Sequence, residues 1–312
     1  MQTRTMILEP RQPFDFALTA GYLTYFRGTY AADRFEDGVY RRAIVIDDNP
    51  LLVSVRTGKT KLNVDVLGEH VGVCQAKAAA REIGWLLGCD TDLTGFYRIA
   101  EADAVLAPIV RKLYGLHPTR TASMYETLVL AVTGQQIAAS VAAIIRRLLV
   151  EHLGATVEVD GTTYHIFPTP EAVLAAGMDG LRSLKLSSRK AEYILGIAAK
   201  SAGRELDTRE IQDLPDSEVS KRLLAIRGVG PWTASWVLLR ALGREDAFPS
   251  GDLALQRIMS RLYFGGRALS QEKLEEFSHR WSPYRSFVVV YVFAAARLGL
   301  LSQTGNQAQI GP

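Results

Sequence analysis

Gly228-Val229-Gly230-Pro231 has the composition of a tight turn at which one helix ends and another begins. Glycine gives access to positive φ angles and to close approach of a second backbone, and proline is tolerated at the first position of a helix. Such a helix start carries free N–H groups and the positive end of the helix dipole, so it can bind an anion without any side chain. The turn therefore favours an anion site, although a tight turn between two packed helices can use the same residues.

Asp252 begins another predicted helix further along the chain, directly after Pro249-Ser250-Gly251. An aspartate in this position commonly caps the helix, because its carboxylate accepts hydrogen bonds from the first free N–H groups. Asp246, the other aspartate nearby, precedes Phe248-Pro249 on a predicted loop. A carboxylate so placed after the turn favours a functional site over a purely structural turn.

Trp232 and Trp236 are four residues apart, which places both side chains on one face of the helix that begins at Pro231. Phe293 and Arg297 repeat this spacing on the last long predicted helix. Large aromatic side chains are mostly buried, so core packing can account for each pair. Arg297 also has a simple alternative, as a solvated residue near the end of its helix.

The elements that position these residues follow from the hydrophobic pattern. Residues 1–90 mix strands and helices, and the turn residues between consecutive strand candidates suit antiparallel neighbours. This region is predicted to be a small α+β domain. The strand candidates are 3–8, 39–46, 51–57 and 61–67, and the helix candidates are 14–26 and 71–87.

From residue 91 to residue 302, nearly every long segment has helical periodicity, with glycine or proline between segments. A hairpin is predicted at 156–166, and 303–312 is predicted to be a frayed polar tail. The predicted fold class is therefore mainly α with an N-terminal α+β lobe. The predicted helices are 92–113, 124–133, 138–152, 170–176, 178–184, 188–203, 216–226, 231–242, 252–262, 270–280 and 284–299.

Composition limits the class of protein. The chain has 312 residues, of which 48% are hydrophobic and 22% charged, enough to bury a substantial core. It shows neither a run of membrane-spanning length nor a signal peptide, so we expect a cytoplasmic protein. Cys74 and Cys89 are too few for a four-thiolate iron–sulfur cluster and are interpreted as core thiols, and the five histidines lack metal-ligand spacing. The net charge of +3 is compatible with nucleic acid but does not argue for it alone.

Three further segments complete a family pattern: Gly134-Gln135-Gln136-Ile137, residues 186–194 and Tyr284-Arg285-Ser286-Phe287. Together with the turn and the segment from Pro249 to Asp252, they resemble the helix-hairpin-helix (HhH-GPD) DNA glycosylase superfamily. The resemblance is closest to its 3-methyladenine DNA glycosylase II (AlkA-like) branch and covers most of the chain.

The resemblance implies a helix-hairpin-helix DNA glycosylase fold. Residues 1–90 would form a TBP-like antiparallel sheet domain. Residues 91–302 would form the helical body, in two lobes with the active-site cleft between them.

The resemblance also implies that Asp252 is the catalytic carboxylate. Cleavage of an N-glycosidic bond develops positive charge on the sugar, and a fixed anion in a dry pocket stabilises that charge as it forms. Whether Asp252 also orients or deprotonates the attacking water stays open. Members of the branch can carry a second acid directly before this position, where this chain has Gly251. Members that also nick the DNA backbone form a Schiff base from a lysine where this chain has Trp232, so we expect a monofunctional glycosylase.

By the same resemblance, Trp232, Trp236 and Phe293 line the base pocket. Aromatic faces there stack on an extruded base and attract one made cationic by alkylation. Arg297 would lie one turn away on the same helix face as Phe293 and is a candidate for substrate binding, with its solvated alternative still open.

Gln136 stands at the position of the wedge that fills the gap left by the extruded base. A glutamine there can intercalate, hydrogen-bond the orphaned partner base or cap a helix. Arg285 is interpreted as a structural residue buried against a helix end or a carboxylate, and Arg146-Arg147 as a solvated face.

Phosphate contacts are expected from the backbone of Gly228 and Gly230 and from the hydroxyl of Thr233. Arg189 and Lys190 lie at another helix start and suit either phosphate or solvent. Because phosphates position a duplex without specifying sequence, binding is expected to be largely independent of sequence.

We therefore interpret the chain as a base excision repair glycosylase that flips an alkylated purine of the 3-methyladenine type out of duplex DNA and hydrolyses its N-glycosidic bond. No redox cofactor, catalytic metal or iron–sulfur cluster is expected, although the resemblance allows a monovalent cation at the hairpin backbone. Its partner would be double-stranded DNA with damaged bases. We expect a monomer without membrane contact, in a bacterial or archaeal nucleoid. The alternatives are a glycosylase of the same superfamily for deaminated or oxidised bases and a non-catalytic helix-hairpin-helix DNA-binding protein.

Overall fold

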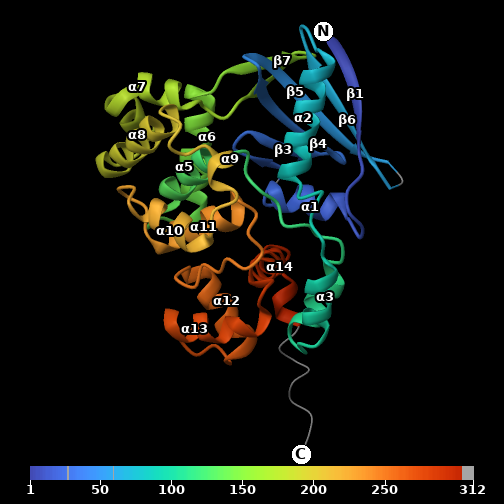
Figure 1. Ribbon diagram of the computed structural model, residues 1–312, viewed down its shortest axis with the longest axis vertical. Coiled ribbons are helices and arrows are strands. Elements are labelled where there is room, and N and C mark those ends of the chain that lie inside the picture. Colours follow the sequence, from blue (N-terminus) through green and yellow to red (C-terminus); the bar gives the residue numbers. More distant parts are fainter. Residues whose placement is uncertain (27, 59, 304–312) are drawn as a thin grey trace, which may run out of the picture.

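The computed structural model describes residues 1–26, 28–58 and 60–303. Figure 1 shows a sheet domain at one end of the molecule and helices that continue from it to the opposite end. The predicted fold class, mainly α with an N-terminal α+β lobe, is confirmed. The predicted tail lies outside the described residues, apart from Gln303 in the 3-10 turn η2 (Leu300–Gln303).

Six antiparallel strands form the sheet of the N-terminal lobe, in the spatial order β1-β6-β5-β4-β3-β2. The predicted strands are confirmed as β1 (Gln2–Leu8), β4 (Val39–Ile46), β5 (Asn49–Thr57) and β6 (Leu62–Gly68). The sequence pattern misses β2 (Thr29–Tyr30), which has only two residues, and β3 (Asp33–Glu36), which is short and mostly charged.

Two helices accompany this sheet, α1 (Phe16–Leu23) and α2 (Val73–Leu86), and α2 packs against β1, β4 and β6. The valine and leucine side chains of the central strands form a hydrophobic core with the alanines of α2. This core holds the lobe together, because burial of apolar surface is the main stabilising contribution to folding.

The helical body contains most of the remaining elements. Most helices begin close to their predicted residue, because serine, threonine, aspartate or proline stands at most of the starts. Its helices are α3 (Thr94–Glu101), α4 (Leu106–Lys112), α5 (Met124–Gly134), α6 (Ala139–Leu153), α7 (Pro170–Ser183), α8 (Ser188–Ala202), α9 (Thr208–Ile211), α10 (Asp216–Leu224), α11 (Pro231–Arg240), α12 (Leu253–Tyr263), α13 (Gln271–Ser278), the 3-10 turn η1 (His279–Trp281) and α14 (Arg285–Arg297), and the predicted hairpin is formed by β7 (Thr156–Val159) and β8 (Thr162–His165). The sequence pattern does not predict α4 as a separate helix, nor the short α9.

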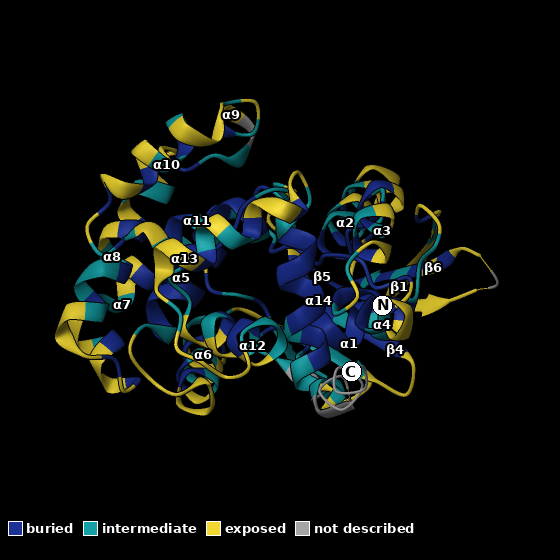
Figure 2. Cartoon of the chain, turned by 90° about the horizontal axis from the view of Figure 1, so that it is seen from below, coloured by how far each residue is buried: buried dark blue, intermediate teal, exposed yellow. Residues whose placement is uncertain are grey.

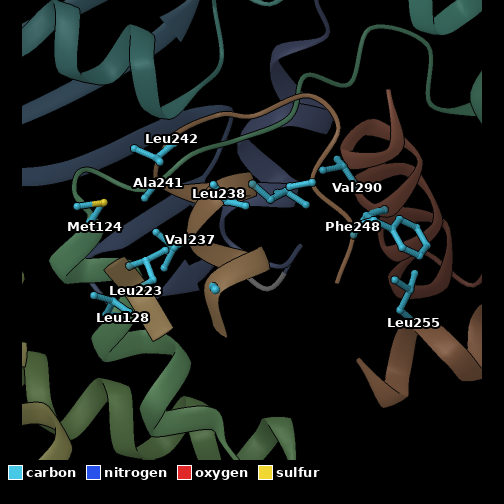
Figure 3. Close-up of a cluster of buried hydrophobic side chains, with 14 of the residues drawn as sticks. Met124, Leu128, Leu223, Val237, Leu238, Ala241, Leu242, Phe248, Leu255 and Val290 are labelled. Carbon is cyan, nitrogen blue, oxygen red and sulfur yellow. The ribbon is translucent and has the colours of Figure 1, made fainter. Parts of the chain in front are cut away.

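Helix α14 runs through the centre of this body. Residues 286–292 are all buried, and Figure 2 shows the helix in the colour of buried residues at the middle of the molecule. Its valines pack with apolar side chains of α5, α10, α11 and α12 in one hydrophobic core, part of which is drawn in Figure 3. Trp232 and Trp236 on α11, and Phe293 and Arg297 on α14, are therefore carried by two helices that are anchored in the same core.

Two local predictions need correction, and a third is confirmed. The single helix predicted at 92–113 is two helices, because the carboxylate of Asp103 accepts hydrogen bonds from the backbone N–H groups of Val105 and Leu106 and starts α4. The break predicted at residue 177 is present, because Gly177 has the non-helical angles φ 64° and ψ −167° and divides α7 into two helical segments. Cys74 is exposed and is not a core thiol, whereas Cys89 is half-buried.

A buried cluster of charges joins the sheet to the helical body. Arg42 of β4 lies 3.0 Å from Asp33 of β3 and 2.7 Å from Glu126 of α5, and all three side chains are buried. Arg285 makes a second structural cluster, at 3.0 Å from Asp246 and 2.7 Å from Glu275, so its predicted structural role is confirmed. These clusters fix the elements around the site described next.

Candidate active site

Asp252 caps helix α12, as its position in the sequence predicts. Its Oδ1 atom accepts hydrogen bonds from the backbone N–H groups of Ala254 at 2.9 Å and Leu255 at 3.0 Å. Its backbone is extended, with φ −77° and ψ 115°, which is typical of a capping residue. The start of α12 therefore fixes one oxygen of the carboxylate.

The other oxygen of Asp252 is held by two tryptophans. Trp232 Nε1 donates to Oδ2 at 2.8 Å, and Trp236 Nε1 donates to the same atom at 3.3 Å. All four donors are neutral, and no cation forms an ion pair with Asp252 among the residues that the structure describes. The negative charge is oriented without being neutralised, which is the state that stabilises a cation forming nearby.

A cavity of about 980 Å³ lies beside this carboxylate. The four predicted substrate residues line it together with Asp252, so residues from three helices converge on one space. The ring centroids of Trp236 and Phe293 are 5.9 Å apart with an interplanar angle of 51°. Aromatic walls and a few charged groups are typical of a ligand pocket. The residues predicted to line it are Trp232, Trp236, Phe293 and Arg297.

Arg297 is not a solvated residue at a helix end. Its guanidinium carbon lies 3.8 Å from the ring centroid of Tyr25, 4.7 Å from that of Tyr22 and 5.8 Å from that of Phe293. It lines the cavity and lies among aromatic rings that attract its charge. The alternative of a solvated Arg297 is wrong.

The hairpin glycines have different roles. Gly228 has φ 90°, and a side-chain carbon there would lie 2.4 Å from the ring of Tyr193, so this position requires glycine. Gly230 has extended backbone, with φ −107°, so the expectation of a positive φ is wrong for this residue. The space beside Gly230 is open, which leaves the start of α11 accessible to a ligand.

Thr233 faces the interior and not the solvent. Its side chain is buried, and its hydroxyl accepts a hydrogen bond at 3.3 Å from Gln135 Nε2, which also donates to the carbonyl of Gly228 at 3.0 Å. The predicted phosphate contact through this hydroxyl does not fit that position, because a buried hydroxyl cannot meet the duplex. Gln135 belongs to the motif at residues 134–137, but the sequence does not indicate that its side chain links this loop to the hairpin at Gly228.

Gln136 occupies the exposed loop between α5 and α6 with φ 57°, a rare value for a residue with a side chain. The cap of α6 is Ala138, without any side-chain hydrogen bond, so the capping alternative for Gln136 is wrong. Leu253, directly after Asp252, also lines the cavity and is 65% exposed. An apolar side chain so exposed beside the catalytic candidate is a feature that the sequence pattern does not single out.

The two cations at the start of α8 differ in exposure. Arg189 is exposed, and its Nε donates to the hydroxyl of Tyr193 at 2.7 Å. Lys190 is partly buried, and its ammonium donates to the carbonyl of Thr133 at 3.0 Å. Burial first, and then the charge of Arg146, lowers the pKa of Lys190 below its ordinary value. A phosphate contact therefore fits Arg189 better than Lys190.

Arg146 is not part of a solvated face, contrary to prediction. It donates to the hydroxyl of Tyr30 at 2.6 Å and to that of Thr133 at 3.0 Å, and it lines the cavity. Arg147 beside it is exposed and lies 3.8 Å from Glu151. The N-terminal lobe thus supplies cavity residues, Tyr25 and Tyr30 among them, that sequence reasoning missed because no motif marks them.

Residues 1–26, 28–58 and 60–303 contain neither a metal-binding group of side chains nor a membrane-spanning helix. No group of three or more histidine, cysteine, aspartate or glutamate side chains in these ranges could hold a metal ion. None of the helices in the same ranges combines the length and apolar character needed to cross a bilayer.

Comparison with known proteins finds relatives over nearly the whole chain. A family model for the HhH-GPD superfamily of base excision DNA repair proteins matches residues 129–283. A DNA-3-methyladenine glycosylase of Bacillus subtilis is 31% identical over 283 residues, which are 90% of this chain and 93% of that protein. The solved structure of a 3-methyladenine DNA-glycosylase from Archaeoglobus fulgidus has a TM-score of 0.81 at 31% identity, covering 95% of this chain and 98% of that chain.

A more distant structure shares the fold alone. The 8-oxoguanine glycosylase/lyase of Clostridium acetobutylicum, solved in complex with double-stranded DNA, has a TM-score of 0.75 at 18% identity. The match covers 96% of this chain and 99% of that one.

Proposed function

This chain belongs to the HhH-GPD superfamily of base excision DNA repair proteins, and we propose that it is a monofunctional glycosylase of alkylated purines. In this proposal it flips the damaged base out of duplex DNA and hydrolyses the N-glycosidic bond between the base and its sugar. One observation carries the proposal: Asp252 is fixed by four N–H donors beside a cavity with aromatic walls.

Asp252 acts on the sugar side of the bond. As the bond to the base lengthens, positive charge develops on the sugar, and the oriented carboxylate stabilises it. Because its donors are already in place, the carboxylate needs no reorganisation during the reaction. Water then completes the hydrolysis at the sugar carbon.

Aromatic rings act on the base side. Trp232, Trp236 and Phe293 offer ring faces and edges around the cavity, and an alkylated purine that carries positive charge is attracted to such faces. Neutral normal bases lack this attraction, and their pairs cost more to open than a damaged pair. Selection for alkylated purines would thus begin at extrusion and continue in the cavity.

The duplex would be held by the two loops that Gln135 joins. The accessible start of α11 at Gly230 suits a phosphate, and Arg189 offers a cation nearby on α8. Gln136 and Leu253 both line the cavity and are exposed. Either side chain, one polar and the other apolar, is suited to fill the space that the extruded base leaves in the duplex. These contacts describe one copy of the chain on one damaged duplex.

Cofactors are not needed for this chemistry. Hydrolysis through a carboxylate and water transfers no electron, and Trp232 offers no amine for a Schiff base. A monovalent cation at the hairpin backbone stays a prediction. The carbonyl of Gly228 already accepts a hydrogen bond from Gln135.

The substitution Asp252→Asn tests the proposal. It removes the negative charge with little change in shape, so single-turnover release of bases from methylated duplex DNA should fall by at least about 100-fold. Affinity for a duplex with an abasic-site analogue should stay close to wild type. Asp179→Asn, an exposed aspartate on α7, is the matched control and should release bases at the wild-type rate.

Three outcomes would contradict the proposal. If Asp252→Asn still releases bases at the wild-type rate, Asp252 is not the catalytic carboxylate. If the wild-type protein binds the duplex but releases no base, the non-catalytic DNA-binding alternative is correct. A covalent enzyme–DNA adduct trapped by borohydride would show that the enzyme is not monofunctional.

A further inference from the structure

The N-terminal lobe places a group of aromatic side chains in the cavity that the helix-hairpin-helix motif does not account for. Tyr25 and Tyr30 come from the segment between α1 and β3, and both line the same cavity as Arg297 of α14 and Arg146 of α6. These side chains come from three separate parts of the chain, so their meeting is a property of the fold.

The backbone beneath Tyr25 is strained. Tyr25 and Phe26 have φ values of 58° and 55°, two successive residues with side chains in the left-handed region. This turn follows α1 directly, and the Tyr25 N–H bonds to the Tyr22 carbonyl at 3.1 Å. Strain of this kind persists only where surrounding contacts hold it, and it is concentrated at functional sites.

Arg297 lies against the ring that this turn presents. The distance of 3.8 Å from its guanidinium carbon to the Tyr25 centroid is the shortest of its three aromatic contacts. Across the described ranges, the guanidinium of Arg297 takes part in no hydrogen bond and no ion pair. A guanidinium fixed by rings but with unused N–H donors beside a cavity is arranged to bind a planar ligand through acceptor atoms.

Tyr25 is itself held from behind. Its ring packs against that of Tyr30, whose hydroxyl accepts a hydrogen bond from Arg146 at 2.6 Å. The two tyrosine rings lie 4.3 Å apart. Movement of the Tyr25 ring would break contacts with Tyr30 and Arg297 together, so the arrangement presents Arg297 in a fixed position.

We propose that Tyr25 is a positioning residue that holds Arg297 so that it hydrogen-bonds the exocyclic oxygen of an extruded 6-oxopurine, such as an alkylated guanine. The inference rests on the proposed glycosylase function and adds to it the residues that distinguish a 6-oxopurine from a 6-aminopurine. An oxygen at position 6 accepts from the guanidinium, and O6 is one of the two acceptors, with N7, through which arginine recognises guanine. In 7-methylguanine the methyl group occupies N7, so O6 is the acceptor that remains. A 6-aminopurine instead turns its amino N–H groups toward the N–H groups of the guanidinium. Both sets are donors, so they stay unpaired inside the cavity.

The test compares two lesions in one substrate. Single-turnover release of 7-methylguanine and 3-methyladenine from the same methylated duplex is measured by mass spectrometry, and the ratio of the two rates is followed across variants. Arg297→Met should lower the ratio of 7-methylguanine to 3-methyladenine by about tenfold, since a specific contact of this kind discriminates strongly between bases. Tyr25→Leu, which removes the ring under Arg297, should lower the ratio in the same direction.

Tyr25→Phe keeps the ring and, at about pH 6, where the Tyr25 phenol with its pKa of about 7 is protonated, should keep the wild-type ratio. Tyr114→Leu removes an exposed tyrosine that does not line the cavity, and it should match wild type in the same way. Should Tyr25→Leu fail to fold, Arg297→Met still decides the contact with the base, and Tyr25→Met, which also removes the ring, takes the place of Tyr25→Leu.

The outcomes separate the inference from the function on which it rests. If wild type releases both lesions and Arg297→Met lowers both rates equally, or leaves both unchanged, the substrate class proposed here is wrong. If Arg297→Met shifts the ratio but Tyr25→Leu does not, Tyr25 has no positioning role. If wild type releases neither lesion, the proposed function fails and this inference falls with it.

Discussion

The indole N–H of Trp232 lies 2.8 Å from Oδ2 of Asp252, while Oδ1 of the same carboxylate accepts two backbone N–H groups. One side chain of α11 and the start of α12 thus orient the carboxylate together. Trp232 stands where members of the family with lyase activity are expected to carry a lysine. A residue that would otherwise be a nucleophile is here a hydrogen-bond donor to the catalytic candidate.

Trp232→Phe should slow base release while leaving the fold intact. The substitution keeps a ring in the cavity and removes only the donor, and a hydrogen bond to a charged group contributes about 1.5–3 kcal/mol. The single-turnover rate should therefore fall by roughly 10- to 100-fold. Trp236→Phe, whose donor is at 3.3 Å, should cost less. Equal losses in the two variants would contradict the role assigned to Trp232.

The two hairpin glycines should respond differently to alanine. Gly228→Ala forces a side chain into the left-handed region and against Tyr193, so the free energy of unfolding should fall by at least about 1 kcal/mol in urea denaturation. Gly230→Ala meets open space and extended backbone, so stability should change by no more than about 0.5 kcal/mol. Its duplex affinity should weaken, because the added methyl group lies where a phosphate would approach. Unchanged affinity would move the phosphate site away from Gly230.

Tyr25 should make stability depend on pH in the alkaline range. Burial alone would raise the pKa of its phenol, but the charges of Arg297, Arg146 and Arg240 lower that pKa to about 7. The unfolded chain has the ordinary tyrosine pKa of about 10. The ionised phenol therefore stabilises the fold fully at a pH above the pKa of about 10 in the unfolded chain. This contribution is lost as the pH falls through the pKa of about 7 in the folded protein.

The comparison with Tyr25→Phe isolates this contribution. The difference in unfolding free energy, wild type minus variant, should grow as pH rises from about 7 to about 10. Tyrosinate absorbance of the folded wild type should rise at a lower pH than in the variant. A flat difference across this range would show that Tyr25 stays protonated in the fold.

Arg42→Met should destabilise the protein strongly. It leaves the buried carboxylates of Asp33 and Glu126 without their cation, a change that costs about 3–5 kcal/mol. Burial already raises the pKa of Glu126, and loss of Arg42 would raise that pKa further. A raised carboxyl pKa means that stability falls as pH rises, so the deficit should be smaller at acidic than at neutral pH.

A surface ion pair provides the control for Arg42→Met. Arg56→Met breaks an exposed pair with Asp65 and should cost less than about 1 kcal/mol. If the two variants are equally stable, the buried cluster does not stabilise the junction between the lobes.

The sequence is informative where a single segment decides the structure. Pro231 and Asp252 begin their helices through local backbone chemistry, so the turn and the cap are predictable from a few neighbours. Four strands and most helices follow for the same reason. The break between α3 and α4 at Asp103 is also decided locally, but it is not predicted because the hydrophobic pattern continues through it with helical spacing.

The sequence is least informative where distant segments meet. Arg146 and Tyr30 are 116 residues apart, and nothing in either segment indicates that they share a cavity. The orientation of Thr233 depends in the same way on Gln135, 98 residues earlier. Whether a charged or polar side chain faces solvent or an interior is decided by such partners and not by its own neighbours.

Helix α14 combines two tasks in one late segment of the chain. Its buried valines fill the middle of the helical body, and its Phe293 and Arg297 form part of the cavity. During synthesis, the helices made earlier would therefore leave the ribosome with an unfilled centre. A product that stops before α14 would lack both a filled hydrophobic core and a complete substrate site.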